Sequence, residues 1–394
     1  MKTILVAGGG TGGHVFPGLA VAQAIRQLTE HSAVQIVFAG SPRGLENRIV
    51  PKYGYDLELL DVEPMKGGGP ARAIKGALVA AKAMRHATGI IGRLRPSAVL
   101  SVGGYAAGPA ALAGVRARVP LAVLEPNSTL GLANRLLAPF AKRAYVAWPE
   151  TARIFRGDKA RVYGVPLRDG FAPRPYTAQK DLRRVLVLGG SQGAQALNER
   201  VPSAIARVVK QLGPVQVIHQ TGADREEAVR KEYEEARVTT ATVVPFLDDV
   251  ADRIATADVV IARAGANTVA EIAAIGRPSI LVPFPHAADD HQAKNGMALA
   301  ELGGAICIRQ EAADEVRLAT ELSLLLVDAE RRASMAQAAR EHGRPRAAHD
   351  IAKDLLALAG IAVTKGSPAD RPAKTNGSSA NGSSVKLRAS KEVS

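Results

Sequence analysis

Residues 4–14 read Ile4-Leu5-Val6-Ala7-Gly8-Gly9-Gly10-Thr11-Gly12-Gly13-His14, and residues 185–195 repeat the pattern as Val185-Leu186-Val187-Leu188-Gly189-Gly190-Ser191-Gln192-Gly193-Ala194-Gln195. Each stretch has an apolar run typical of a buried strand, then a glycine-rich turn and the start of a helix. Such a unit opens a doubly wound domain, in which helices cover both faces of a parallel sheet. Two of them predict two domains, with a cleft between the carboxyl ends of the two sheets.

Strand and helix patterns alternate through both halves, which predicts an α/β fold with right-handed crossovers. Strands are expected at 3–7, 35–39, 57–62, 98–102, 121–124 and 144–147, and again at 185–188, 215–219, 242–244, 259–262, 279–282 and 305–308. The helix after the first glycine turn is expected at 17–30, and the last helical pattern ends at 358.

The chain has 394 residues, which fits two domains better than one. A stretch rich in proline and arginine, 165–182, disfavours regular structure and predicts the linker. We therefore expect an N-terminal domain at 1–164 and a C-terminal domain at 183–360. The tail, 361–394, is basic and poor in apolar residues, so it is expected to be disordered.

Composition excludes several classes of protein. No apolar run approaches the roughly 18 residues of a membrane-spanning helix. The single cysteine, Cys307, excludes a disulfide scaffold and a multi-cysteine zinc site. The start runs into a strand pattern without a secretory signal, so a reduced, cytoplasmic compartment is expected. The formal charge is +14, but aromatic content is only 4% and no nucleic-acid motif occurs, so no nucleic-acid partner is expected.

The first glycine turn satisfies G-x-G-x-x-G, a pattern that offers backbone N–H groups and a helix N-terminus to an anion. A nicotinamide site would also need an acidic residue at the end of the second strand. That strand is followed by Gly40-Ser41-Pro42-Arg43, which has no carboxylate, although Arg43 could suit a 2′-phosphate. The alternative is a turn needed only for packing; two such turns facing one cleft favour a binding function.

Nothing in the sequence indicates a metal or a cofactor. G-x-x-x-x-G-K-[ST] is absent, which argues against a P-loop kinase or ATPase, and no two aspartates stand two apart to hold a cation on a nucleotide diphosphate. A bound diphosphate would then be neutralised by helix N-termini and basic side chains. No metal and no cofactor are therefore expected.

Five motifs resemble those of the MurG family, the peptidoglycan glycosyltransferases that add N-acetylglucosamine (GlcNAc) to lipid I. They are Gly9-Gly10-Thr11-Gly12-Gly13-His14-Val15-Phe16-Pro17-Gly18, Ser101-Val102-Gly103-Gly104-Tyr105-Ala106-Ala107-Gly108-Pro109, Gly189-Gly190-Ser191-Gln192-Gly193-Ala194, Arg263-Ala264-Gly265-Ala266-Asn267-Thr268-Val269-Ala270-Glu271, and 283–295 from Pro283 to Asn295. The resemblance covers about 1–358, in order and at compatible spacing.

The resemblance implies a GT-B fold: two Rossmann-like domains, the first for the acceptor and the second for the donor, UDP-GlcNAc. It implies an inverting transfer of GlcNAc to the C4 hydroxyl of MurNAc in lipid I, the undecaprenyl-pyrophosphoryl-MurNAc-pentapeptide, giving lipid II.

The resemblance also implies site residues. Substrate-binding roles fall on Thr11, Gly12, Gly13, Asn127, Arg168, Ser191, Leu247, Ala266, Asn267, Thr268, Val269, Ala270, Glu271 and Gln292. Among them Arg168 and Ser191 would meet the diphosphate, Glu271 the ribose hydroxyls and Gln292 the sugar. Leu247 would contact uracil through its backbone. Around Glu125 this chain has Leu124-Glu125-Pro126-Asn127, where the family more often has His-Glu-Gln-Asn.

The reaction needs a base near the attacking hydroxyl and positive potential at the departing diphosphate. His14 is the first candidate for the base, because an imidazole titrates near neutral pH. Glu125 is the second candidate.

A lipid-linked acceptor implies a peripheral protein at the cytoplasmic face of the inner membrane. Residues 65–98 contain no Asp or Glu, and interleave basic with apolar residues, namely Lys66, Arg72, Lys75, Lys82, Arg85, Arg93 and Arg95 with Ile74, Leu78, Met84, Ile90, Ile91 and Leu94. This composition predicts a surface attracted to anionic lipid; an ordinary helix with a solvated basic face is the alternative.

Three other functions stay open at this point: a related GT-B enzyme with another sugar or lipid acceptor, a nucleic-acid binder, and a dinucleotide-dependent oxidoreductase.

Overall fold

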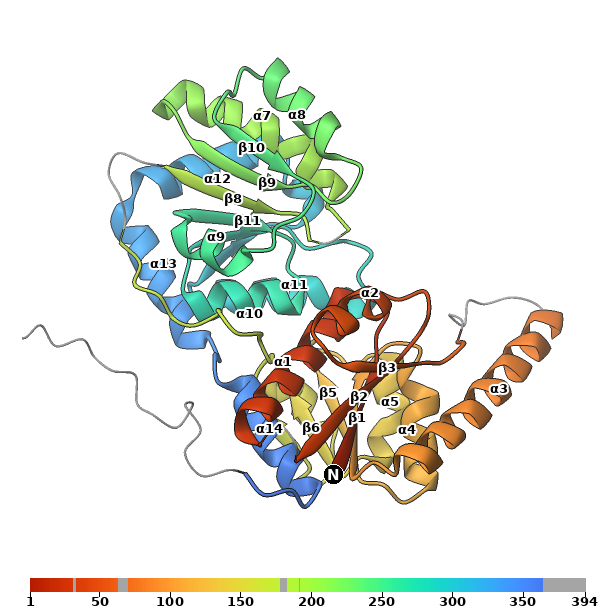
Figure 1. Cartoon of the computed structure of the whole chain (residues 1–394). Coiled ribbons are helices and arrows are strands. Elements are labelled where there is room, and N and C mark those ends of the chain that lie inside the picture. Colours follow the sequence, from red (N-terminus) through yellow and green to blue (C-terminus); the bar gives the residue numbers. More distant parts are fainter. Residues whose placement is uncertain (31–32, 63–69, 178–182, 191, 364–394) are drawn as a thin grey trace, which may run out of the picture.

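The computed structural model describes residues 1–30, 33–62, 70–177, 183–190 and 192–363. They form two α/β domains, each built on a parallel sheet (Figure 1). Most of the predicted tail, 364–394, and the last part of the predicted linker, 178–182, lie outside the described residues. Among those that are described, no helix is both long and apolar enough to span a lipid bilayer.

The first domain contains a seven-stranded sheet in the order β3-β2-β1-β4-β5-β6-β7, in which every pair is parallel. Its strands are β1 (Lys2–Gly8), β2 (Val34–Gly40), β3 (Asp56–Leu59), β4 (Ala98–Gly103), β5 (Leu121–Glu125), β6 (Arg143–Val146) and β7 (Ala160–Val162). Its helices are α1 (Gly12–Leu28), α2 (Glu46–Lys52), α3 (Pro70–Leu94), α4 (Ala107–Arg116), α5 (Leu132–Leu137), the 3-10 turn η1 (Ala138–Phe140) and α6 (Pro149–Ala152).

The second domain contains a six-stranded parallel sheet in the order β10-β9-β8-β11-β12-β13. Its strands are β8 (Arg184–Leu188), β9 (Gln216–Gln220), β10 (Ala241–Val244), β11 (Val259–Ala262), β12 (Ser279–Leu281) and β13 (Ala305–Cys307). The helices after β8 are α7 (Gln195–Leu212), α8 (Glu226–Glu235), α9 (Val250–Thr256), α10 (Ala266–Ile275), η2 (Ala288–Asp290), α11 (His291–Glu301), η3 (Gln310–Ala312), α12 (Glu315–Val327), α13 (Ala329–His342) and α14 (Ala347–Leu358).

The opening strand of each domain is buried on both faces. In β1, Ile4 and Val6 belong to one apolar cluster, whereas Leu5 and Ala7 belong to the cluster on the opposite face. This alternation explains why the sequence shows a continuous apolar run rather than an alternating one. In both sheets the strand order reverses beside this first strand, between β1 and β4 and between β8 and β11. The predicted α/β fold with two doubly wound parallel sheets is confirmed.

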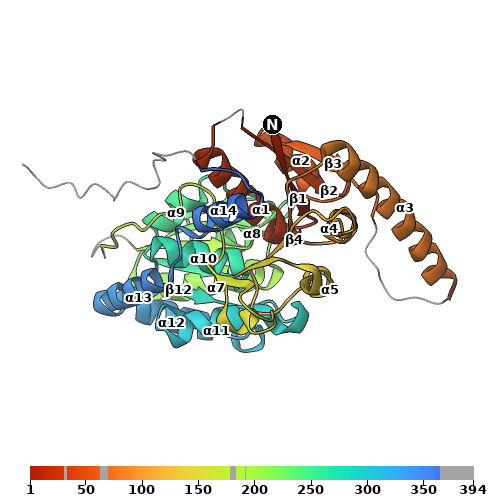
Figure 2. The same ribbon diagram turned by 90° about the horizontal axis from the view of Figure 1, so that it is seen from below.

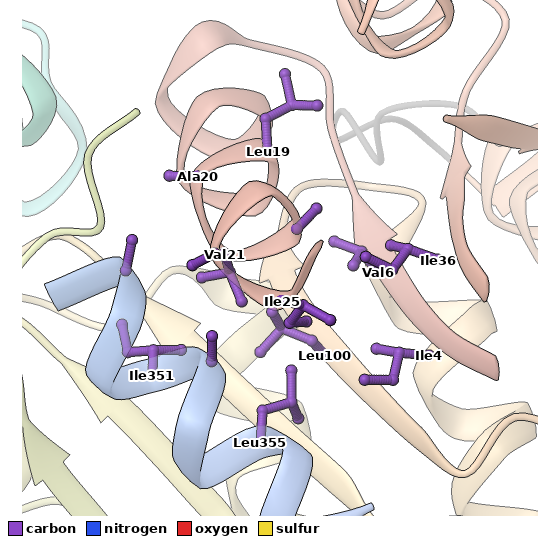
Figure 3. Packing of buried hydrophobic residues seen from close by; sticks show 14 of the residues in the cluster. Ile4, Val6, Leu19, Ala20, Val21, Ile25, Ile36, Leu100, Ile351 and Leu355 are labelled. Carbon is purple, nitrogen blue, oxygen red and sulfur yellow. The ribbon is translucent and has the colours of Figure 1, made fainter. Parts of the chain in front are cut away.

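The last helix, α14, packs on the first domain although it follows the second domain in the chain. Ile351 and Leu355 are fully buried in the cluster that contains Ile4, Leu100 and Ile25 (Figure 3). The Asp354 carboxylate accepts hydrogen bonds from Tyr145 (2.8 Å) and from Arg143 (3.1 Å). Helix α14 falls within the range expected for the C-terminal domain, 183–360, and its apolar face is buried against the first sheet.

The described part of the linker is irregular but packed. Val165, Leu167 and Phe171 are buried in a cluster of the second domain. The guanidinium of Arg277, itself 3% exposed, donates to the carbonyls of Arg174 and Pro175 at 3.1 Å each. These contacts fix the residues that carry the chain from one sheet to the other.

Candidate active site

A cleft of about 2330 Å³ lies between the domains, where α1 and α2 approach α10 and α11 (Figure 1). Both glycine-rich turns, the loop after β5, the linker and the N-terminal ends of α10 and α11 line it. The cleft brings together thirteen of the predicted site residues, namely Thr11, Gly12, Gly13, His14, Glu125, Asn127, Arg168, Leu247, Ala266, Asn267, Thr268, Glu271 and Gln292.

Two of the described predicted residues do not line this cleft. Val269 is 3% exposed in the core of the second domain, and Ala270 packs against the same cluster. Both lie on the side of α10 that faces the sheet, so a motif on a helix offers only part of its length to a ligand. Ser191 lies outside the described residues.

His14 lies in the first turn of α1, directly after the glycine turn. Its Nδ1 is 3.4 Å from the hydroxyl of Thr11. Burial lowers the pKa of His14 below its usual value, while the carboxylates of Glu125 and Glu46 act against this and His291 adds to it. A lowered pKa keeps the imidazole neutral near pH 7, which is the form that can accept a proton.

Glu125 ends β5 and is 3% exposed. Its Oε1 accepts hydrogen bonds from the backbone N–H (3.2 Å) and side-chain amide (3.0 Å) of Asn127. Its Oε2 accepts from the Gly131 N–H (2.9 Å) and the Asn134 amide (3.1 Å). Both oxygens are therefore engaged in holding the loop that follows the strand, which favours His14 over Glu125 as the proton acceptor.

Arg168 stands at the junction of the domains. Its guanidinium lies 4.3 Å from the ring centre of Phe16, donates to the Tyr53 hydroxyl at 3.2 Å, and is 4.0 Å from the carboxylate of Glu271. These contacts from both domains fix a cation in the cleft, where it can meet a diphosphate.

Glu271 lies in the second turn of α10, and its side chain is 14% exposed. Burial raises its pKa to about 7, and Arg168 opposes the rise. Among the described residues the carboxylate accepts no hydrogen bond, so both oxygens can accept from a vicinal diol.

The N-terminus of α10 faces the first domain. Gly265 precedes it in an extended conformation, and the first N–H groups of a helix lack partners within that helix. The Asn267 amide donates to the carbonyl of Gly12 at 3.2 Å, across the cleft. Two helix N-termini, those of α1 and α10, thus lie in contact at one point and create positive potential there.

Two further predicted residues lie at the rim of the second domain. The Oε1 of Gln292 accepts from the Phe284 N–H at 3.0 Å, which leaves its amide group as a donor. The Leu247 side chain is 7% exposed and belongs to the core, so only its backbone can serve a ligand. The side chain of Leu247 therefore packs in the core, while the residue also lines the cleft.

Three residues of the site had no signal in the sequence. Asn134 holds Glu125 and accepts from Ser101 at 2.9 Å, Tyr53 contacts Arg168, and Glu46 binds the first glycine turn. A glutamate or an asparagine within a short helix reads as a solvated residue; only the fold shows that it points inward. In the described ranges no group of three or more His, Cys, Asp or Glu could hold a metal ion.

Two family models match the chain. The glycosyltransferase family 28 N-terminal domain matches residues 4–146, and the glycosyltransferase family 28 C-terminal domain matches residues 184–351. The chain belongs to glycosyltransferase family 28. The two family 28 models correspond to the two sheets described above, and the match makes the chain a glycosyltransferase with a GT-B fold.

Curated family 28 relatives cover nearly all of the chain. A protein of Sorangium cellulosum is 51% identical over 91% of this chain and 89% of its own, and one of Acidithiobacillus ferrooxidans is 40% identical over 91% and 98%. Both are named UDP-N-acetylglucosamine–N-acetylmuramyl-(pentapeptide) pyrophosphoryl-undecaprenol N-acetylglucosamine transferase.

Solved structures agree. Acinetobacter baumannii MurG superimposes with a TM-score of 0.73 at 32% identity, covering 91% of this chain and 100% of its own. The predicted resemblance to the MurG family is thereby confirmed. The UDP-GlcNAc 2-epimerase of Neisseria meningitidis, at 13% identity and a TM-score of 0.63, shares the fold alone.

Proposed function

We propose that this family 28 chain transfers GlcNAc from UDP-GlcNAc to the C4 hydroxyl of MurNAc in lipid I, with inversion, giving lipid II for peptidoglycan synthesis. The observation that carries the proposal is the cleft, because residues expected for donor and acceptor come from both domains and line one cavity. The names of relatives 40–51% identical to the chain support the same donor and acceptor.

The reaction follows from this arrangement. The acceptor hydroxyl attacks C1 of the donor sugar from the face opposite UDP, His14 takes the hydroxyl proton, and the C1–O bond to UDP breaks. Glu125 holds the loop beside the imidazole through its four hydrogen bonds. Arg168 and the N-terminus of α10 stabilise the negative charge that develops on the departing diphosphate.

The donor would lie along the second domain. Glu271 accepts both ribose hydroxyls, Gln292 donates to the N-acetylglucosamine, and the backbone at Leu247 meets uracil. Ala266, Asn267 and Thr268 present the helix N-terminus to the phosphates, whereas Thr11, Gly12 and Gly13 approach from the first domain. This division gives the diphosphate positive potential without a bound cation, so the proposed mechanism uses neither a metal nor a cofactor.

The acceptor end of the cleft is apolar. It is lined by Val79, Ala80 and Met84 of α3, by Leu112 of α4, and by Leu132 and Leu136 of α5. Leu132 and Leu136 are 68% and 65% exposed, and Phe140 continues their stripe along η1. Such a surface suits a lipid-linked acceptor and supports a peripheral position at the cytoplasmic face of the inner membrane.

The membrane surface proposed from 65–98 needs revision in its details. Ile90 and Ile91 are buried in the core of the first domain, so they are not available to lipid. Arg93 pairs with Glu58 at 2.7 Å, and Lys82 lies 4.0 Å from Asp61. The side chains of Lys66, Arg72, Ile74, Lys75 and Leu78 lie outside the described residues. Helix α3 projects from the first domain (Figure 2). Its Lys82 and Arg85 are exposed and support docking on anionic lipid.

Transfer of labelled GlcNAc from UDP to a lipid I analogue, with and without EDTA, tests the function. We expect transfer of GlcNAc to continue in the presence of EDTA. UDP-glucose and UDP-galactose should not replace UDP-GlcNAc as the donor. Transfer of another sugar in the donor panel, or to a diacylglycerol instead of lipid I, would assign the chain to a related GT-B lipid glycosyltransferase.

A further inference from the structure

Glu46 joins the first glycine turn to the end of the neighbouring strand. It opens α2, yet it is only 1% exposed. Its Oε2 accepts from the Gly10 N–H at 2.7 Å, and its Oε1 accepts from the N–H (2.7 Å) and hydroxyl (3.1 Å) of Ser41. One carboxylate therefore holds together the segments that follow β1 and β2.

The chain leaves room for this carboxylate with three glycines. A Cβ added at Gly9, Gly40 or Gly44 would lie 2.2, 2.4 or 2.1 Å from an atom of the Glu46 side chain. Real Cβ contacts are essentially never that short, so none of the three can carry a side chain while Glu46 keeps its place. The glycines at these positions are thus matched to a buried carboxylate as well as to the turn itself.

Glu46 also decides which amides of the turn are left for a ligand. The Gly10 N–H is taken by Glu46, and the Gly9 N–H donates to the Gly103 carbonyl at 3.2 Å. Gly12 and Gly13 begin α1, where the first N–H groups have no partner within the helix. The turn as held by Glu46 therefore points the N-terminus of α1 at the cleft.

The same turn carries His14. Three ionisable groups affect the charge of this imidazole: Glu125 at the end of β5, Glu46 on α2, and His291 on α11 of the second domain. Glu46 adds negative charge near the imidazole without forming a hydrogen bond to it. Glu46 thus affects both the position of the His14 imidazole and its proton affinity, although Glu46 itself does not line the cleft.

Filling this space with a carboxylate is costly for the fold, because burial of a charged group is unfavourable unless several donors compensate it. A turn that needed only a hydrogen-bond acceptor could be held by a serine or an asparagine. A carboxylate also adds negative charge to the surroundings of His14, which neither of these neutral side chains would do.

We propose that Glu46 is a positioning residue for glycosyl transfer: it holds the first glycine turn so that the α1 N-terminus and the His14 imidazole face the reacting atoms. The proposal rests on the proposed function, since it assigns to His14 the proton of the acceptor hydroxyl. Glu46 acts through the turn and through its charge.

The test compares Glu46→Gln, Ser41→Ala and the control Glu150→Gln, which alters an exposed glutamate of α6. Four properties are measured: the unfolding midpoint, UDP affinity, kcat with both substrates saturating, and the pKa of His14 from its NMR titration, assigned with His14→Gln. In Glu46→Gln we expect a roughly 10–100-fold lower kcat with UDP affinity retained. The pKa of His14 should fall, because a negative charge near the imidazole is lost.

Ser41→Ala removes one donor to Glu46 and should lower kcat less than Glu46→Gln, while Glu150→Gln should match the wild type. Ser41→Ala decides the question if Glu46→Gln does not fold. A wild-type kcat together with an unchanged His14 titration overturns the proposal. So does a loss of kcat that follows the unfolding midpoint while the His14 titration stays unchanged, because that result describes a role in stability alone.

The NMR arm separates this proposal from the proposed function. If the wild type transfers no GlcNAc, the proposed function fails, and the His14 titration in Glu46→Gln still decides whether Glu46 sets the state of the imidazole. A lowered pKa then supports the positioning of the turn, and an unchanged one overturns it.

Discussion

The guanidinium of Arg168, from the linker, lies 4.0 Å from the carboxylate of Glu271 on α10. Arg168 also rests on Phe16 and donates to Tyr53, both of the first domain. The pair therefore joins the linker to α10 inside the cleft, and Arg168 affects the charge of Glu271. Burial raises the pKa of Glu271 to about 7 in spite of Arg168.

UDP-GlcNAc binding is expected to strengthen as the pH rises through about 7, since the ionised Glu271 carboxylate accepts both ribose hydroxyls. Calorimetric titration between pH 6 and pH 8 measures the effect. Glu271→Gln should bind the donor more weakly at pH 8, by about 10-fold or more, and should lose most of this pH dependence. The control Glu227→Gln, on the exposed side of α8, should behave as the wild type.

The stability of the same variant gives an independent check. A carboxyl whose pKa is raised in the folded state favours the fold at low pH, and this contribution is lost as the pH rises from about 4.5 to about 7. The free energy of unfolding of the wild type should therefore fall across this window relative to Glu271→Gln. A difference in the free energy of unfolding between the two proteins that does not change with pH would contradict a raised pKa of Glu271.

Arg168→Ala should lower kcat/KM by roughly 10–100-fold, because a charge-assisted contact to the diphosphate is lost. Arg168→Lys should restore only part of it, since a lysine cannot reproduce the planar guanidinium that stacks on Phe16. Steady-state kinetics with varied UDP-GlcNAc measures both. The matched control is Arg174→Ala, which removes another linker arginine, one paired with Asp252 away from the cleft lining; equal losses in the two variants would argue against the assigned role.

His14→Ala should lower kcat by about 10²–10⁴-fold while UDP binding is retained, as expected for loss of a general base. In the wild type, kcat should decline as the pH falls through the His14 pKa, which burial lowers from its usual value. Ionisation of Glu271 should add a second rise in kcat/KM near pH 7. This rise should be absent in Glu271→Gln, whereas the rise at lower pH that reports His14 should remain. Near-wild-type turnover of His14→Ala with both substrates saturating would return the role to Glu125.

Apolar periodicity predicted the sheets closely. The strand expected at 259–262 is observed as Val259–Ala262, and most others differ by one or two residues at an end. Buried parallel strands are continuous apolar runs bounded by turn residues, so their signal is local. The short edge strand β7 (Ala160–Val162) was not predicted, because three partly exposed residues carry no such run.

Helix starts were less accessible to sequence reasoning. The first helix was expected from residue 17, but α1 begins at Gly12 and contains Pro17. Glycine and proline residues usually predict the absence of a helix, so the helix was expected to begin only at Pro17. In the structure, the sheet and Glu46 hold the glycine turn in place, and the helix begins directly after it. Likewise the local sequence did not show that Ile351 and Leu355 pack on the first domain. The apolar face of a helix predicts that the face is buried, but not which sheet it packs against.

Binding to anionic vesicles should be sensitive to salt. Arg85→Glu should weaken it about five-fold or more, since each basic residue near an anionic surface contributes about 1 kcal/mol. Leu132→Ser with Leu136→Ser should weaken it further by removing exposed apolar side chains on α5. Vesicle sedimentation at two salt concentrations measures this, with Leu324→Ser, on an exposed site of α12, as the control. Equal binding to neutral vesicles, unaffected by salt, would count against the docking surface.

Leu355→Ala should destabilise the first domain, from the far end of the chain. Leu355 is fully buried against Ile4, Ile25 and Leu100 (Figure 3), so its truncation leaves a cavity that costs about 2–5 kcal/mol. Hydrogen exchange should then quicken at the β1 and β2 amides and stay slow at those of β8. Leu324→Ala, a half-exposed leucine of α12, should change neither set. Faster exchange in β8 with β1 still protected would instead place α14 in the cooperative unit of the second domain.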